Sequence, residues 1–296
     1  MRILGTGMSG SVGRALIPAL SGDGHRIIRL KTGTIQSQDE IHWDPLKPLA
    51  PETVSGFDAV IHLAGESVFG LWTTAKKQAI QRSRVDGTRH LAEALARAPT
   101  KPKTFLSASA VGFYGTNASQ PCSEEAKGGE GFLASVARDW EAATDPARQA
   151  GIRVVNLRIG IVLSRNAGAL AMMLPAFRLG LGGKMGRGTQ YLSWIHIADT
   201  AGAIRRCLHT PAIFGPVNLV APKPVTNAEF TRALARKLSR PALLAVPGFL
   251  LRFLPGDMAR ETFLASQQCL PRKLLESGFR FAYPDLNAAL QNLLPQ

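Results

Sequence analysis

The 296-residue chain has little of what a secreted, membrane-spanning or metal-cluster protein needs. It has only three cysteines, at positions too scattered for a disulfide framework or a cysteine metal site: Cys122, Cys207 and Cys269. It also lacks a run of about eighteen apolar residues, and no apolar signal segment precedes its first glycines. We therefore expect a cytoplasmic protein with reduced thiols, no membrane association and no metal site.

Acidic residues are scarce beside basic ones. The chain has 35 Lys and Arg against 21 Asp and Glu, a formal net charge of +14 and a pI near 10.3. A basic surface attracts anionic partners. The basic residues are dispersed, however, and no zinc finger, RNA-binding signature or basic-aromatic array accompanies them. The composition favours solvated faces or steering of an anionic substrate over a specific nucleic-acid partner.

The first thirteen residues contain the most informative pattern. A short apolar run, Ile3-Leu4, enters a glycine-dense turn, and apolar residues at helical spacing follow. In a dinucleotide-binding unit the first glycine permits the turn, the second admits a pyrophosphate, and the third lets the helix pack on the strand. A glycine-rich surface turn is the alternative. The expected cofactor contacts here are Gly7, Ser9, Gly10, Ser11, Val12 and Gly13.

The end of the expected second strand, residues 26–30, bears on cofactor choice. NAD-selective folds place an acidic residue there to hold the ribose hydroxyls. This strand ends in Leu30-Lys31-Thr32, and no carboxylate follows until Asp39. A cation and a hydroxyl suit a 2′-phosphate, so Lys31 and Thr32 favour NADP(H) over NAD(H).

Alternating strand and helix patterns continue to about residue 163 and predict an α/β fold, a Rossmann doubly wound parallel sheet with a smaller C-terminal substrate lobe. Small residues at the ends of the fourth and fifth strands would let a cofactor lie close to the backbone. We assign to that site Leu63, Ala64, Gly65, Ser107 and Val162. The expected division is a cofactor domain over 1–163, to which 189–220 returns, and a lobe of 164–188 and 221–296.

Several local features add narrower expectations. Pro18 should kink the first helix, and a long helix should run from Thr73 to Ala98. His62, in the middle of a strand, is either a satisfied core histidine or a catalytic one. Thr226 with Glu229 reads as a capping box. The rest of the chain is expected to be helical apart from 279–283.

These motifs together resemble the extended short-chain dehydrogenase/reductases, and within them the atypical group called epimerase family proteins. The resemblance runs from end to end and implies a nucleotide-sugar-epimerase-like fold with bound NADP(H). The motifs that carry it are Thr6-Gly7-x-x-Gly10-x-x-Gly13, Val60 to Glu66, Ser83-Arg84, the serine strand before Tyr114-Gly115, Trp140-Glu141, Gly180 to Gly183, Trp194 to Asp199, Pro271 to Leu274 and Gly278-Phe279-x-Phe281.

The chain departs from the extended enzymes at their proton-transfer pair. Those enzymes carry Y-x-x-x-K shortly before a helix glutamate. Placing Glu141 on that glutamate puts Leu133 and Ala137 where the tyrosine and lysine should stand. Neither side chain can transfer a proton, so the resemblance implies that the usual machinery is absent.

The candidates for chemistry are therefore Ser109, Tyr114 and His196. By resemblance Ser109 would hydrogen-bond a substrate carbonyl or hydroxyl, although a serine at a strand end can also cap its own turn. Tyr114 needs a cationic neighbour to act as a base and otherwise packs under its loop. His196 could line the cleft, with Asp199 either orienting it or capping the next helix. Arg84 could bind a phosphate as a fork or form a surface salt bridge.

Three functional hypotheses follow. The first is an NADP(H)-dependent epimerase or oxidoreductase that acts on an unknown small carbonyl or sugar-like substrate without the Tyr/Lys pair. The second is a catalytically inactive NADP(H)-sensing or regulatory protein. The third is a basic scaffold that binds an acidic partner or nucleic acid. The resemblance leaves open a homodimer formed through the long helices.

Overall fold

The computed structural model describes residues 1–116, 120–242 and 258–295. These residues form two compact units, each assembled from three separate segments of the chain. The first unit consists of Met1–Ala110, Ser135–Arg158 and Ala201–Val217, and the second of Val111–Ala134, Ile159–Thr200 and Asn218–Gln296. Among the described residues, no helix is both long and apolar enough to cross a membrane.

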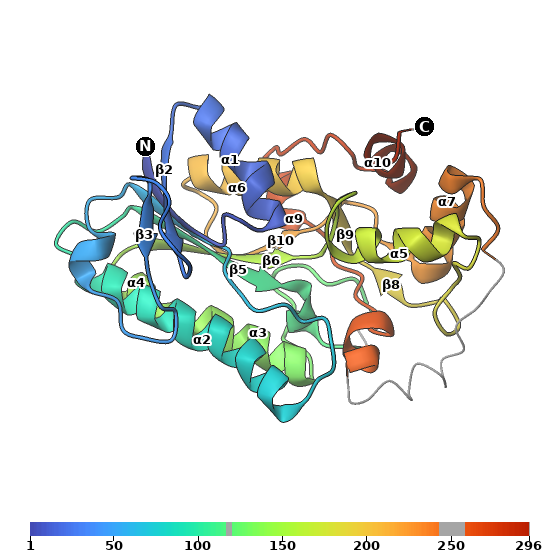
Figure 1. Ribbon diagram of the computed structural model, residues 1–296, viewed down its shortest axis with the longest axis horizontal. Coiled ribbons are helices and arrows are strands. Elements are labelled where there is room, and N and C mark those ends of the chain that lie inside the picture. The colour runs from blue at the N-terminus through green and yellow to red at the C-terminus, as the bar shows by residue number, and fades with distance from the viewer. Residues whose placement is uncertain (117–119, 243–257, 296) are drawn as a thin grey trace. The chain divides into compact units, whose positions relative to one another are not determined.

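A seven-stranded sheet forms the centre of the first unit (Figure 1). The strand order is β10-β6-β5-β4-β1-β2-β3, and the pairs that β1 makes with β2 and β4 are parallel, as are β2 with β3 and β4 with β5. This is the Rossmann order, so the expected fold class is confirmed. The strands are β1 (Arg2–Thr6), β2 (Arg26–Lys31), β3 (Glu40–His42), β4 (Ala59–His62), β5 (Thr104–Ala110), β6 (Arg153–Ile159) and β10 (Gly215–Leu219).

Helices cover both faces of this sheet. In Figure 1, α1 and α6 lie on one face, and α2, α3 and α4 lie on the other. The core between the sheet and α2 is fully buried. There Leu4, Val60 and Phe105 of the strands pack against Leu91 and Leu95 of α2. The helices are α1 (Ser11–Gly22), α2 (Thr74–Arg97), α3 (Phe132–Ala142), α4 (Asp145–Gln149) and α6 (Ile197–His209); short 3-10 turns are η1 (Pro51–Val54) and η2 (Val111–Tyr114).

Local sequence signals account for the helix boundaries. Thr73 accepts a hydrogen bond from the Lys76 backbone N–H and starts α2, which confirms the expected long helix. Pro18 lies inside α1, and the helix continues through it to Gly22. At one edge of the sheet, β10 lies beside β6.

The second unit is a smaller α/β assembly. Its core includes Leu170, Trp194 and Leu290, and its helix α7 begins at the expected capping box, in which Thr226 and Glu229 bond reciprocally. Its elements are β7 (Ile161–Leu163), α5 (Gly168–Arg178), β8 (Tyr191–Leu192), β9 (Trp194–His196), β11 (Val225–Thr226), α7 (Asn227–Leu238), the π-helical turn η3 (Ala259–Phe263), α9 (Arg272–Glu276) and α10 (Leu286–Leu293).

One expectation for the C-terminal part is wrong. Residues 264–271 are not helical, because Cys269 forms a β-bridge with Cys122 and the Leu270 N–H donates to the Cys122 carbonyl at 2.9 Å. Pairing with a distant segment thus overrides the local helical pattern. The expected helix over 243–257 lies outside the described residues.

Candidate functional site

The glycine turn lies where the strand order of the sheet reverses, between β1 and β4. Gly7 has a φ of +68°, and a Cβ there would come within 2.5 Å of the Leu63 carbonyl carbon. The Leu63 N–H donates to the Thr6 carbonyl at 3.1 Å. A Cβ on Gly13 would lie 2.4 Å from Met8 Cα. Only glycine fits at either position, and the turn is thereby pressed onto the end of β4, where open α/β sheets bind ligands.

The N-terminus of α1 is open to an anion. Gly10 is its N-cap, is exposed, and provides no side-chain hydrogen bond, and the first turn holds no acidic residue. The first N–H groups of a helix have no intrahelical acceptor and carry the positive end of its dipole. Those at Ser11, Val12 and Gly13 can therefore receive a phosphate, and Ser9 is exposed beside them.

The end of β2 carries more charge than the sequence indicated. Glu40 on β3 accepts from Arg29 at 2.8 Å, from Lys31 at 3.5 Å and from the Gln36 backbone N–H at 2.7 Å. The Gln36 N–H, and then the two cations, lower the pKa of this carboxyl. Two cations against one carboxylate leave an excess positive charge beside the exposed Thr32. Glu40 was missed because only the β2–β3 register, Arg29 opposite Glu40, brings it there.

Arg84 on α2 faces the end of β4. Its Cζ lies 3.4 Å from where a Cβ of Gly65 would stand and 5.1 Å from the Trp140 ring centroid. It donates to the Ile80 carbonyl at 3.2 Å and forms no ion pair with any described residue, so the salt-bridge alternative is not realised. Burial lowers the pKa of Arg84 to about 10, which leaves it charged at neutral pH. It is a fork-shaped donor without a carboxylate.

His62 is a satisfied core histidine. It is fully buried at the end of β4, with Nδ1 2.6 Å from Thr6 Oγ1 and Nε2 2.9 Å from Thr88 Oγ1. Trp140 Nε1 donates to the same Thr88 hydroxyl at 2.8 Å. Burial lowers the pKa of His62 to about 4, so the ring is neutral at physiological pH. Its place is structural: it ties β1, β4 and α2 together beneath the turn.

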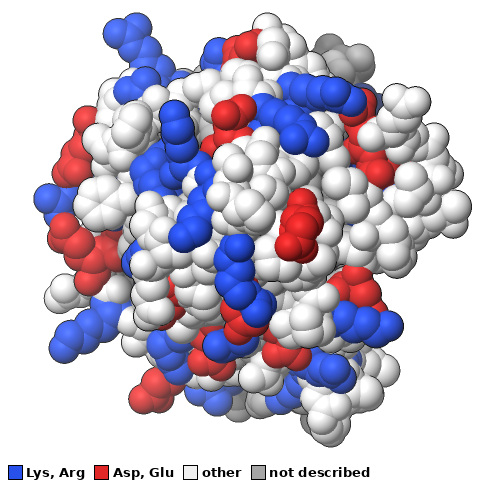
Figure 2. Space-filling model, turned by 90° about the vertical axis from the view of Figure 1, so that its left-hand side faces the viewer, with Lys and Arg blue, Asp and Glu red and all other residues white. Residues whose placement is uncertain are grey.

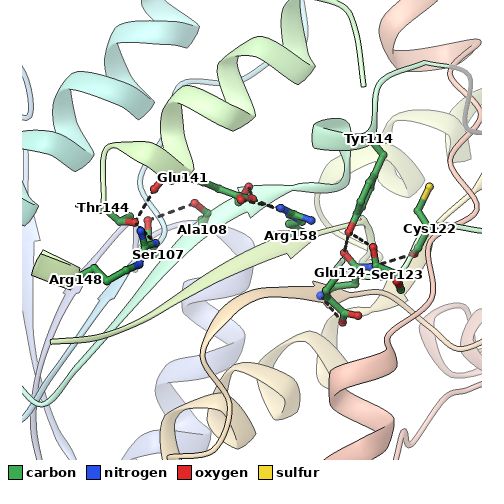
Figure 3. Close-up of polar contacts among 12 residues, drawn as sticks. Ser107, Ala108, Tyr114, Cys122, Ser123, Glu124, Glu141, Thr144, Arg148 and Arg158 are labelled. Carbon is green, nitrogen blue, oxygen red and sulfur yellow. Dashed lines mark hydrogen bonds and ion pairs between the residues drawn. The ribbon is translucent and has the colours of Figure 1, made fainter. Parts of the chain in front are cut away.

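Ser109, at the end of β5, has a carboxylate partner. Its hydroxyl donates to Glu141 Oε1 at 2.7 Å. Arg158 grips the same carboxylate with two bonds, Nε to Oε1 at 2.8 Å and Nη2 to Oε2 at 2.9 Å, and both side chains are largely buried (Figure 3). The sequence pointed to Ser109 alone, and Trp140-Glu141 stood out only as a family marker. Arg158 carried no signal.

Three other candidates, Ser107, Val162 and Tyr114, contact neighbouring residues of the fold. Ser107 is fully buried in β5, and Val162 lies in β7, paired with Ile195. Tyr114 is buried, and its hydroxyl lies 2.7 Å from Asn218 Oδ1 and 3.0 Å from the Ser123 carbonyl, both possible acceptors of its one proton (Figure 3). This network matches the packing role foreseen as the alternative for Tyr114.

His196 is buried and stacks on Tyr283, with ring centroids 3.9 Å apart. Its Nδ1 accepts from the Ala198 N–H at 3.1 Å, and burial lowers its pKa. Among the described residues, Nε2 meets no partner of ordinary hydrogen-bond geometry. Asp199 accepts from the Ala282 and Tyr283 N–H groups at 2.7 and 2.9 Å. Asp199 therefore fastens the C-terminal segment, which neither sequence interpretation foresaw.

A switch-point glycine turn, an uncapped helix N-terminus and a Rossmann sheet define a dinucleotide-binding class of fold. The sequence agrees: the chain belongs to the NAD dependent epimerase/dehydratase family, whose sequence profile matches residues 3–219. A second profile, a domain of unknown function named DUF1731, matches residues 246–293. Within the family the chain is similar to proteins called epimerase family proteins. One from Mycobacterium leprae is 39% identical over 96% of this chain and 92% of that protein.

Two solved structures are similar over nearly the whole chain. The human epimerase family protein SDR39U1, crystallised with NADPH, is 32% identical with a TM-score of 0.89, and the match covers 99% of both chains. A nucleoside-diphosphate sugar epimerase from Corynebacterium glutamicum is 38% identical with a TM-score of 0.80, covering 98% of this chain and 57% of that one.

Proposed function

We propose that the protein binds NADP(H) at the glycine turn and acts as an epimerase or oxidoreductase on a small carbonyl or sugar-like substrate. The observation that carries the proposal is the N-terminus of α1, which has no side-chain cap and no acidic residue in its first turn. It follows the turn at Gly7, which packs against the Leu63 backbone. Such an N-terminus provides backbone donors for a pyrophosphate. The human relative crystallised with NADPH supports the same assignment.

The residues at the end of β2 favour NADP(H), which carries a 2′-phosphate, over NAD(H). Lys31 and Thr32 would hold the 2′-phosphate, and the excess charge of Arg29 and Lys31 over Glu40 favours an added anion. Arg84, which lies beside Gly65 and forms no ion pair with a described residue, would hold a further anionic group of the cofactor or substrate. The remaining contacts in the first unit would be the backbone at residues 63–65 and Ser107. NADP(H), when bound, supplies the hydride.

Ser109 is the side chain that we assign to the reacting group of the substrate. Because its proton goes to Glu141, its oxygen presents lone pairs, which suit a substrate hydroxyl as donor. Arg158 and Glu141 act as positioning residues that fix the direction of the Ser109 hydroxyl. His196 is a second candidate for proton transfer, while the hydroxyl of Tyr114 is already engaged. The similar protein from Corynebacterium glutamicum, called a nucleoside-diphosphate sugar epimerase, supports a sugar-like substrate.

A second function is an NADP(H)-sensing protein without turnover. It is favoured by the placement of Leu133 and Ala137 where the extended enzymes carry tyrosine and lysine, and by the buried network that occupies Tyr114.

Three buried free thiols support the cytoplasm as the compartment for either function.

Hydride exchange from labelled NADPH, across a panel of carbonyl compounds and nucleotide sugars, separates the two functions. For an enzyme we expect exchange with at least one member, lost in Ser109→Ala with NADPH affinity retained. The matched control is Ser21→Ala, an exposed serine on α1. Clear NADPH binding without exchange would favour the sensor, and no NADPH binding would contradict both functions.

A further inference from the structure

A cluster of three potential metal ligands lies in the first unit, away from the glycine turn. Asp23 follows the last residue of α1, His25 precedes β2, and His209 ends α6. His25 Nε2 and His209 Nε2 are 3.3 Å apart, and His209 Nε2 lies 3.6 Å from Asp23 Oδ2. One ligand atom from each residue falls within 4.8 Å of the others. The fold makes this cluster, since 184 residues separate the two histidines.

The three atoms present more lone pairs than protons. A neutral imidazole carries one proton, so a single hydrogen can lie between the two facing Nε2 atoms, and the carboxylate oxygen is an acceptor only. A cation placed among the three atoms would accept one lone pair from each of them.

The spacing fits a tetrahedral cation. With metal–nitrogen bonds of about 2.0–2.1 Å, two imidazole nitrogens on a tetrahedral centre stand about 3.3 Å apart. The observed nitrogen separation is 3.3 Å, Asp23 Oδ2 lies 3.6 Å from His209 Nε2, and all three ligand atoms lie within 4.8 Å of one another. Imidazole with carboxylate is a donor set of zinc and its neighbours in the first transition row. His209 is 40% exposed, which leaves room for water as a fourth ligand.

We propose that Asp23, His25 and His209 form a binding site for a zinc-like divalent cation, which fastens the α1–β2 turn to the end of α6. The cation would join two helices that cover the same face of the sheet (Figure 1). One of them, α1, begins at the glycine turn. The site is independent of the function proposed above and does not require NADP(H).

Neighbouring charges set the expected strength. Arg205 binds both oxygens of Asp23, and the Met1 ammonium lies 3.2 Å from His25 Nδ1. Both positive groups oppose a second cation, and Arg205 competes for the Asp23 oxygen. A cation at His25 Nε2 also moves the ring proton to Nδ1, facing the amino group. Replacing Arg205 should therefore tighten binding, which is the opposite of what replacing a ligand does.

Calorimetric titration of untagged protein with Zn²⁺ tests the site, with the visible absorption of bound Co²⁺ reporting tetrahedral geometry. We expect one cation per chain, affinity at least about tenfold weaker in His209→Ala and in Asp23→Asn, and tighter binding in Arg205→Gln. His90→Gln, a histidine on α2 outside the cluster, should bind as the parent does. Bound Zn²⁺ should raise the melting temperature of the parent and not of His209→Ala.

His209 and Asp23 lie near the surface, so these variants should fold, and the unchanged melting temperature of the metal-free forms checks that. Absence of saturable binding would overturn the proposal. So would equal affinity in the parent and His209→Ala, or weaker binding in Arg205→Gln.

Discussion

The Ser109 hydroxyl donates to Glu141 Oε1 at 2.7 Å, on a carboxylate that Arg158 already holds with two bonds. The position that extended enzymes use to orient substrate is thus joined to a buried ion pair. Arg158 is 4% exposed, and the Glu141 carboxylate compensates its buried charge. The three side chains form one hydrogen-bonded polar unit.

Removing one charge of this pair should be costly. We expect Glu141→Gln to lower the free energy of unfolding by about 3–5 kcal/mol, since it removes the negative charge that holds the buried Arg158 guanidinium with two bonds. Urea denaturation at neutral pH measures the change. The double variant Glu141→Leu with Arg158→Leu should lose less, because no charge is stranded. A double variant at least as unstable as Glu141→Gln would contradict this account.

Acid should destabilise the protein through His62. The pKa of His62 is about 4 in the folded chain and about 6.5 when unfolded, so below pH 6.5 the unfolded chain binds a proton that the folded chain does not. The stability that this histidine contributes is complete above pH 6.5 and falls by about 3 kcal/mol as the pH drops to 4. Urea unfolding curves across this pH range should show a larger loss of stability in the parent than in His62→Asn. The His62→Asn variant still contains all the titrating carboxylates, so the difference between the two proteins reports His62 alone. Parallel pH dependences in the two proteins would show that His62 titrates normally.

The glycines of the turn should separate folding from binding. Gly7→Ala forces a Cβ onto the Leu63 backbone at a φ of +68°, so we expect a loss of about 2 kcal/mol or more in unfolding free energy. In Gly10→Val the added Cβ meets only the Gly7 carbonyl oxygen, at 3.2 Å. That variant should remain within about 1 kcal/mol of the parent and lose NADPH binding, because its branched side chain occupies the space of the pyrophosphate. A folded Gly10→Val protein with parental affinity would put the cofactor elsewhere.

Short-range sequence patterns predict most of the fold. The glycine turn, the Thr226–Glu229 capping box and the alternating strands and helices are set by residues within one or two turns of each other, and the structure has them all. Residues 264–271 were misjudged because their partner, Cys122, lies far away in the sequence.

The polar partners of the site required the folded chain. Glu40 reaches Lys31 through strand register, Glu141 reaches Ser109 across 32 residues, and Asp199 bonds backbone 83 residues later. The sequence does not show which partner any of these carboxylates has. Motifs therefore indicate where a cofactor is expected to bind and not how the side chains around that place are held.

The distribution of basic residues on the surface agrees with the sequence. Figure 2 shows Lys and Arg interspersed with Asp and Glu on the face in view, as the dispersed basic residues of the sequence indicated. That distribution agrees with solvated faces and gives no single-sign patch on that face.

Calorimetric titration with NADPH and with NADH tests the central claim most directly. We predict that NADPH binds at least about tenfold more tightly, a difference of about 1.4 kcal/mol, and that Lys31→Ala removes most of this preference while leaving NADH affinity unchanged. Equal affinities for the two cofactors, or binding of neither, would contradict the account.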